Sequence, residues 1–162
     1  AGLCSYHCTC LRSAVVWTGT MAEIVRLEKA NADVLEQVNK LLRQLSDRVP
    51  DCTLELLKNI IENPMTELWA VKENDTIVGM GELAVVLKPE GVIAQIEDVV
   101  VDEEYRNKGL GEQISQKLVE RARVRGARVI QLSSRSTRTA ANALYKKLGF
   151  VHHETNSYYL KL

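Results

Sequence analysis

Hydrophobic residues in the first third of the chain predict one strand followed by two helices. Residues 24–27 alternate in the manner of a short strand, and the Asn-Ala-Asp sequence at 31–33 marks a helix start. Apolar residues then recur at three- and four-residue spacing up to Ser46, which predicts an amphipathic helix. A second, shorter helix is expected over residues 54–61, because Asn63 and Pro64 close it.

The middle of the chain changes to the pattern of strands. Residues 68–72 and 77–87 are apolar and β-prone, and the polar segment 73–76 between them resembles a turn. We therefore expect an antiparallel hairpin. A break at residues 88–91 leads into a third β-prone run over residues 92–101, so the sheet should be mostly antiparallel up to this point.

The last third alternates between helices and strands. Apolar residues every four positions from 110 to 122 predict a helix that ends near Gly126. A strand is expected at 129–132, a helix at 139–148, and strands at 150–151 and 158–160. The chain is thus predicted to form a single α/β (α+β) domain. Its mixed, mostly antiparallel sheet should have six to seven strands, flanked by about four helices.

Composition narrows the range of partners. The 162 residues include 21 basic and 21 acidic side chains, so the formal net charge is zero. A nucleic-acid binder or a protein of anionic membranes would carry a basic excess. The longest apolar runs also fall far short of the roughly 18 residues of a membrane span. We therefore expect neither a nucleic-acid nor a membrane partner.

The first twenty residues differ from the rest and contain three of the four cysteines, Cys4, Cys8 and Cys10. Their spacing fits neither a disulfide framework nor a zinc motif, and no second ligand cluster follows, so we expect no metal. The segment also lacks the regions of a signal peptide, which favours a cytoplasmic protein. We interpret residues 1–20 as a vector-derived or upstream extension and residues 21–162 as the domain, with Met21 a possible start.

The stretch Arg106-Asn107-Lys108-Gly109-Leu110-Gly111 lies between the third predicted strand of the middle segment and the next helix. A helix start leaves backbone N–H groups without partners and carries partial positive charge, and glycines let the backbone approach a ligand closely. These features favour a phosphate site, although an ordinary turn has the same glycines. The dinucleotide fingerprint and the nucleotide-triphosphate loop are both incomplete here.

Together with a second motif, this turn resembles the GNAT superfamily of acyl-CoA-dependent N-acetyltransferases. The turn matches the pyrophosphate-binding pattern Arg/Gln-x-x-Gly-x-Gly/Ala, and residues 141–150 are similar to the late helix of the family with its asparagine, tyrosine and Gly-Phe ending. The resemblance implies transfer of an acetyl group from acetyl-CoA to a primary amine by direct attack in a ternary complex. It also implies that a homodimer is possible.

The resemblance further implies roles for individual residues. Tyr145 would protonate or stabilise the leaving thiolate. Backbone amides of the turn would hold the pyrophosphate, backbone groups of the preceding strand would pair with the pantetheine arm, and Asn142 would hydrogen-bond that arm. The implied cofactor-binding residues are Val99, Val100, Val101, Arg106, Asn107, Lys108, Gly109, Leu110, Gly111 and Asn142.

The general base is sought among carboxylates, because an amine must lose a proton before it attacks. Glu97 and Asp98 are charged residues in an otherwise apolar strand, so at least one is expected to face a cavity. Neighbours in an extended strand point to opposite faces, so we expect only one of them to reach the acceptor pocket. Glu97 is favoured and Glu82 is a second candidate. Pairing with backbone or with an arginine is an alternative for all three.

Several alternatives stay open from the sequence. A non-catalytic CoA-binding sensor or regulatory domain would carry the same motifs. Glu97 and Asp98 followed by three valines are also similar to glucosamine-6-phosphate acetyltransferases, although the arginines of residues 133–138 can equally be solvated loop charges. The acceptor can be a small-molecule or a peptide amine. Cys52 lies away from the motifs, and His152 and His153 are expected at the surface or in the sheet.

Overall fold

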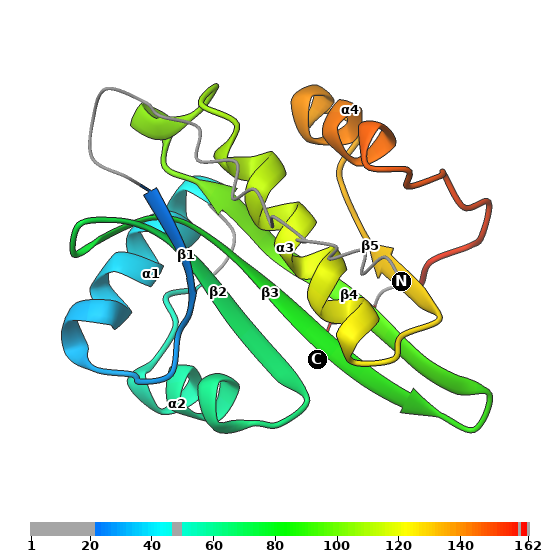
Figure 1. Cartoon of the computed structure of the whole chain (residues 1–162), viewed down its shortest axis with the longest axis horizontal. Coiled ribbons are helices and arrows are strands. Elements are labelled where there is room, and N and C mark those ends of the chain that lie inside the picture. Colours follow the sequence, from blue (N-terminus) through cyan, green and yellow to red (C-terminus); the bar gives the residue numbers. More distant parts are fainter. Residues whose placement is uncertain (1–21, 47–49, 159, 162) are drawn as a thin grey trace, which may run out of the picture.

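A single five-stranded sheet forms the centre of the molecule (Figure 1). The computed structural model describes residues 22–46, 50–158 and 160–161. The strands are β1 (Ala22–Arg26), β2 (Thr66–Glu73), β3 (Thr76–Lys88), β4 (Gly91–Val101) and β5 (Val129–Leu132). They follow one another across the sheet in sequence order, and only the pairing of β4 with β5 is parallel. The expected extension at residues 1–20 lies outside the described residues, as does Met21.

Within the described residues, four α-helices flank this sheet where the sequence pattern predicts them. They are α1 (Ala32–Leu45), α2 (Leu54–Glu62), α3 (Leu110–Val124) and α4 (Thr139–Lys147), and a short 3-10 turn, η1 (Glu103–Tyr105), precedes α3. Asn31 caps α1 by accepting the amide hydrogen of Val34, and Thr53 caps α2 by accepting that of Leu56. These side chains satisfy amides that a helix start otherwise leaves unpaired. The predicted class, a single α/β domain with a mixed and mostly antiparallel sheet, is confirmed.

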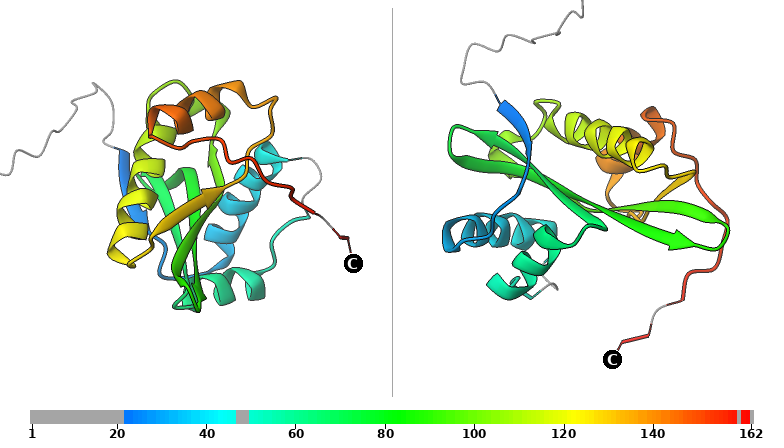
Figure 2. Two further views of the ribbon diagram at one scale, coloured as in Figure 1. Left: turned by 90° about the vertical axis from the view of Figure 1, so that its right-hand side faces the viewer. Right: turned by 60° about the horizontal axis from the view of Figure 1, so that its bottom comes forward.

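The helices cover both faces of the sheet (Figure 2). α1 and α2 pack on one face, where Leu41, Leu57 and Met80 belong to one apolar core. α3 packs on the opposite face, where Ile114 and Leu118 are fully buried against the sheet. The apolar residues that recur every four positions in α3 are therefore the ones that the helix buries against the sheet, as predicted.

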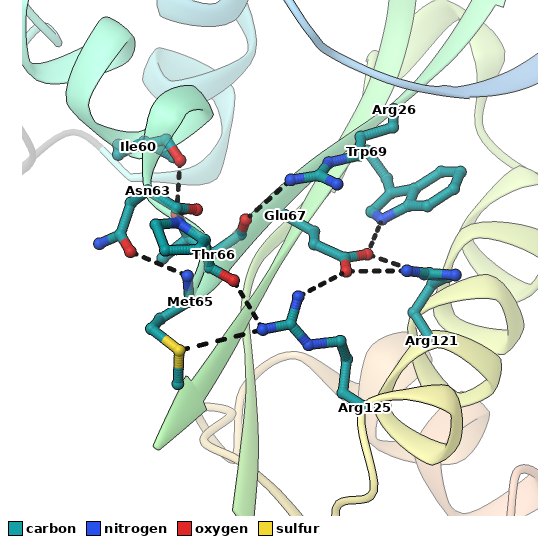
Figure 3. Close-up of polar contacts among 10 residues, drawn as sticks. Arg26, Ile60, Asn63, Met65, Thr66, Glu67, Trp69, Arg121 and Arg125 are labelled. Atoms are coloured by element: carbon teal, nitrogen blue, oxygen red, sulfur yellow. Dashed lines mark hydrogen bonds and ion pairs between the residues drawn. The ribbon is translucent and has the colours of Figure 1, made fainter. Parts of the chain in front are cut away.

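A buried ion pair fastens α3 to β2 (Figure 3). Glu67 of β2 has a fully buried side chain and accepts two hydrogen bonds from Arg121 of α3, at 2.8 and 3.0 Å. Arg125 lies 3.4 Å from the same carboxylate, and the indole nitrogen of Trp69 donates to it at 3.0 Å. The hydrogen bonds from Arg121 hold the pKa of Glu67 below its ordinary value. Glu67 is therefore a charged residue whose burial depends on α3.

An irregularity in β4 changes the direction of its side chains. Glu82 of β3 pairs with Glu97 of β4, and Met80 pairs with Val100, so Gly81 lies opposite both Asp98 and Val99. One extra residue in β4 is a β-bulge, and Asp98 accommodates it with a left-handed backbone at φ 50°. The bulge follows closely on the last paired residue of β4 and β5, Ile96, and precedes the glycine turn.

The segment after α4 differs from its prediction. Strands were expected at 150–151 and 158–160, but none of the residues described after α4 belongs to a strand. Val151, Tyr158 and Leu160 are 87%, 90% and 82% exposed, so no neighbouring segment buries their apolar side chains. Without a partner strand, an extended segment leaves its backbone groups to water. The described sheet consequently has five strands rather than six to seven.

Candidate functional site

Divergence of two parallel strands opens the candidate site. β4 and β5 pair from Ile93 with Val129 to Ile96 with Leu132, and β5 then ends while β4 continues to Val101. Beyond Ile96, the β5-facing edge of β4 therefore has no strand partner in the described chain. Backbone N–H and C=O groups on such an edge can pair with an extended ligand.

A cavity of about 370 Å³ lies where these strands separate. Glu97 and Asp98 of β4 and Tyr145 of α4 contribute to its wall, so the structure brings together the three side chains predicted to be catalytic. The remaining lining residues come from the end of α1, from β4 and from the loop between β5 and α4; they are Leu45, Ser46, Ile96, Val99, Ser133, Ser134, Arg135 and Arg138.

Glu97 and Asp98 both line the cavity, although neighbours in a regular strand point to opposite faces. The alternation of an extended strand is interrupted at Asp98, where the bulge and the positive φ redirect the side chain. Partial loss of hydration raises the pKa of Glu97, and the nearby charge of Asp98 raises it further. Loss of hydration also raises the pKa of Asp98, and Arg138 partly offsets that effect.

Glu82 is close to this pair without lining the cavity. It lies directly opposite Glu97 across β3 and β4, so the two side chains share a face of the sheet. Partial burial raises the pKa of Glu82, and the charges of Asp98 and Glu97 raise it further. The three carboxylates thus form one group in which each negative charge opposes the others.

Tyr145, in the last turn of α4, belongs to the wall that α4 and its preceding loop provide. Its ring contacts Phe150 edge to face, with centroids 5.9 Å apart, and this contact limits the orientations of the phenol. Loss of hydration raises the pKa of Tyr145, while the guanidinium of Arg138 acts in the opposite direction. The phenol therefore keeps its proton at neutral pH and can donate a hydrogen bond into the cavity.

Arg138 connects the two sides of the cavity. Its guanidinium donates a hydrogen bond of 2.8 Å to the backbone oxygen of Leu45, at the end of α1. The contact spans 93 positions in the sequence, so no local pattern indicated it. It places the end of α1 against the loop that leads into α4, and it was missed by the sequence analysis.

The predicted phosphate turn has the geometry of an anion site. Gly109 is the N-cap of α3 at φ 77°, a left-handed backbone that glycine adopts without strain, and no side chain caps the helix there. In the described part of the chain, the amides of residues 107–112 donate to no backbone acceptor. An ideal Cβ at Gly109 would meet only the Gln113 side chain, at 3.9 Å, so the space above the turn is open. A pyrophosphate fits these free donors.

Two basic side chains of the turn, those of Arg106 and Lys108, are held near the start of α3. The guanidinium of Arg106 donates to the backbone oxygen of Val101 at 3.1 Å, and the ammonium of Lys108 stacks on the Tyr105 ring at 4.5 Å from its centroid. Both charges therefore stay close to the helix start. The amide of Asn142, in contrast, donates to the backbone oxygen of Arg135 at 2.9 Å and so supports the loop at the cavity.

A buried aspartate that the sequence analysis did not single out connects the segment before the turn to α1. Asp102 directly follows β4, caps η1 and is 3% exposed. It accepts hydrogen bonds from Lys40 and Gln44 of α1, at 2.8 and 3.3 Å, and from the amide of Glu104 at 3.1 Å. The contact with Lys40 holds the pKa of Asp102 below its ordinary value. The spacing of Lys40 and Gln44 on one face of α1 was the available signal.

The other residues discussed from the sequence lie elsewhere. Cys52 packs at the edge of the core between α1 and α2 and does not line the cavity. His152 and His153 are exposed after α4. Within the described ranges, no group of three or more His, Cys, Asp or Glu side chains is placed to hold a metal ion. The helices searched in those ranges are too short or too polar to cross a membrane.

Comparison with known proteins defines the class of this molecule. Residues 35–150 match the model of the acetyltransferase (GNAT) family, and the chain belongs to that family. An uncharacterised N-acetyltransferase of Escherichia coli is 29% identical over 126 residues, which are 76% of this chain and 75% of the bacterial protein. The family predicted from the turn and from the late helix is thereby confirmed.

Solved structures share the same fold. An acetyltransferase of Trypanosoma brucei superimposes with a TM-score of 0.71 at 29% identity, covering 88% of this chain and all of that one (100%). An aminoglycoside acetyltransferase from an uncultured soil metagenomic sample gives a TM-score of 0.77 at 16% identity, covering 87% and 96%. A further aminoglycoside N-acetyltransferase, solved in complex with CoA, gives 0.74 at 18% identity, covering 91% and 99%. These two low-identity matches show the fold alone.

Proposed function

We propose that this protein transfers an acetyl group from acetyl-CoA to a primary amine by direct attack in a ternary complex. The observation that carries the proposal is the single cavity in which Tyr145, Glu97 and Asp98 meet beside the free edge of β4. The glycine turn and the start of α3 follow β4 in the chain, after the short turn η1. A donor bound at the turn would extend along the free edge of β4 to the cavity.

The donor site is formed mainly by backbone groups. Amides of residues 107–111 would hold the pyrophosphate, with the positive charges of Arg106 and Lys108 beside them. The free backbone edge of Val99, Val100 and Val101 would pair with the amide-rich arm. When bound, acetyl-CoA supplies the thioester that carries the acetyl group. Asn142 takes part by holding the loop between β5 and α4.

Glu97 is proposed as the general base, with Asp98 as its partner. A primary amine is mostly protonated at neutral pH, so a group in the cavity must accept its proton. Raised carboxylate pKa values bring these groups closer to the pKa that a base needs near neutrality. Two negative charges in one cavity also attract the ammonium form of an acceptor.

Tyr145 is proposed as the general acid. Its proton is retained because loss of hydration raises the pKa of the phenol. A hydroxyl held beside a developing negative charge stabilises that charge and can release its proton to it. No covalent intermediate with the protein is required, since Cys52 does not line the cavity.

Substitution of Tyr145 by phenylalanine tests this function. We expect kcat for thiol release from acetyl-CoA to fall about 100- to 10,000-fold, because general-acid help contributes on that order. The dissociation constant for acetyl-CoA, measured by isothermal titration, should change little. Tyr158→Phe is a matched control, since Tyr158 is 90% exposed and does not line the cavity. Equal losses of turnover and acetyl-CoA affinity in Tyr145→Phe would show that the tyrosine has a different role.

A further inference from the structure

Opposite charges face each other across the cavity without forming ion pairs. Glu97 and Asp98 stand on the β4 side, and Arg135 and Arg138 stand on the side of the loop that precedes α4. Among the ion pairs of the described residues, none joins these arginines to these carboxylates. The carboxylates of β4 and the arginines of the loop therefore lie on opposite sides of the cavity and form no direct ion pair.

The guanidinium of Arg135 is the basic group available to a ligand. Arg138 already donates to the backbone oxygen of Leu45. Arg135 is held in place through its backbone, whose oxygen accepts hydrogen bonds from the amide of Arg138 and from the side chain of Asn142. Its guanidinium makes no hydrogen bond or ion pair with any residue that the structure describes. A planar guanidinium is suited to bind carboxylate or phosphate oxygens.

A second group beside Arg135 also lacks a partner. The Oγ atom of Ser134 is buried and has no hydrogen-bond partner in the described structure, although Ser134 lines the cavity. Buried polar atoms are nearly always hydrogen-bonded, so this hydroxyl on the cavity wall is available to a ligand atom or to a water molecule that a ligand displaces. A serine hydroxyl and an arginine together form a small anion-binding group.

We propose that the acceptor amine carries an anionic group, a carboxylate or a phosphate, which binds Arg135 and Ser134 while its amine lies at Glu97 and Asp98. The inference rests on the proposed acetyl transfer and adds the chemical class of the acceptor. A zwitterion of this kind places each of its charges against the opposite charge of the cavity. A polycation would be attracted by the carboxylates of Glu97 and Asp98 but repelled by the arginines on the other side of the cavity.

The volume of the cavity is consistent with a small acceptor. Sites for small molecules usually enclose roughly 300–1,000 Å³, and the cavity of about 370 Å³ is at the lower end of that range. The acceptor shares this space with the reactive end of the donor. An amino acid or a phosphorylated amino sugar is therefore a suitable size.

Paired acceptors test the inference with the full chain. Thiol release from acetyl-CoA is measured with glucosamine 6-phosphate against glucosamine and with an amino acid against its carboxamide. We expect higher kcat/KM for the anionic member of at least one pair, and the pair that shows it identifies the group as phosphate or carboxylate. In Arg135→Gln, the ratio within that pair should fall about 10- to 100-fold, mainly through KM, because a charge-assisted contact is lost. Ser134→Ala should lower it less.

The ratio of kcat/KM values within a pair is compared between the unsubstituted protein and each variant. Differences in the intrinsic reactivity of the two amines cancel in this comparison, because they are the same in every variant. Arg128→Gln is the matched control, because Arg128 pairs with Glu90 at the surface and does not line the cavity, so this variant should keep the ratio. A preference for neutral or polycationic amines, or a ratio that Arg135→Gln leaves in place, would overturn the inference while acetyl transfer stands. Absence of thiol release with every amine would overturn the proposed function and the inference with it.

Discussion

At the scale of single residues, the candidate chemistry depends on two adjacent carboxylates that a bulge directs into one cavity. Asp98 at φ 50° lies next to Glu97, and each contributes to the same wall. Their proximity makes ionisation of the pair less favourable than ionisation of either group alone. The pH dependence of catalysis should therefore report on this pair.

At acidic pH, the dependence of kcat/KM on pH (the acid limb of the profile) should report the ionisation of Glu97. A base acts when it has lost its proton, so activity should rise with pH through the pKa of Glu97, which lies above the ordinary value of a glutamate. Asp98→Asn removes a neighbouring negative charge, lowers the pKa of Glu97 and should shift this limb to lower pH. Glu97→Gln should remove the limb and lower kcat/KM about 100-fold or more.

Glu82→Gln provides the comparison for these two variants. Glu82 lies opposite Glu97 without lining the cavity, so its substitution should shift the acid limb while retaining most of the activity. Should Glu97→Gln keep both the limb and the rate, a different group would be the base.

At the scale of elements, α3 has separate roles at its two ends. Its first turn presents free amides above Gly109, while Arg121 in its last turn and Arg125 at its C-cap hold Glu67 of β2. The ion pair thus fixes the helix whose other end forms the anion site. The two ends can be tested by different variants.

Gly109→Glu is expected to abolish binding of acetyl-CoA by placing bulk and negative charge at the anion site. Gly126→Glu is a closely matched control at the other end of the same helix, because Gly126 has φ 75° against 77° for Gly109 and nothing near an added Cβ. Both variants should lose similar stability, about 1 kcal/mol, since a side chain is strained at positive φ. Only Gly109→Glu should lose affinity in isothermal titration; an equal loss in both would attribute the effect to strain.

Glu67→Gln is expected to destabilise the domain by about 3–5 kcal/mol, because it leaves Arg121 without its charge partner inside the protein. The lowered pKa of Glu67 keeps this stabilisation present at neutral pH, and it is lost as the pH falls through that lowered value. Chemical denaturation at neutral pH measures the difference. Glu90→Gln breaks an ion pair whose side chains are 62% and 52% exposed and should change stability by less than about 1 kcal/mol. Similar losses of stability in both variants would show that burial of the Glu67 ion pair adds nothing to its contribution.

At the scale of the whole molecule, periodicity predicted most elements because each buries one side against the sheet. The helix over residues 31–46 and the helix that follows the glycine turn are examples. The sequence could not show that Asp98 leaves the strand alternation, because a bulge depends on the partner strand and on Gly81 opposite it. Contacts between distant segments, such as that of Arg138 with Leu45, also have no local pattern.

None of the described residues in the two strands expected at 150–151 and 158–160 belongs to a strand. Val151, Tyr158 and Leu160 have the composition of strand residues, but β-propensity describes a side chain that fits a half-buried surface, and here all three are exposed. Composition alone therefore predicted strands that need a partner.

The central claim is that acetyl transfer takes place in a ternary complex within one cavity. Initial rates of thiol release, measured over a matrix of acetyl-CoA and amine concentrations, test it most directly. Direct transfer predicts reciprocal plots that intersect, because both substrates must be bound before either product leaves. Parallel lines would indicate a covalent acetyl-protein intermediate, and absence of thiol release with every amine would contradict the assignment of the cavity as an acetyltransferase site.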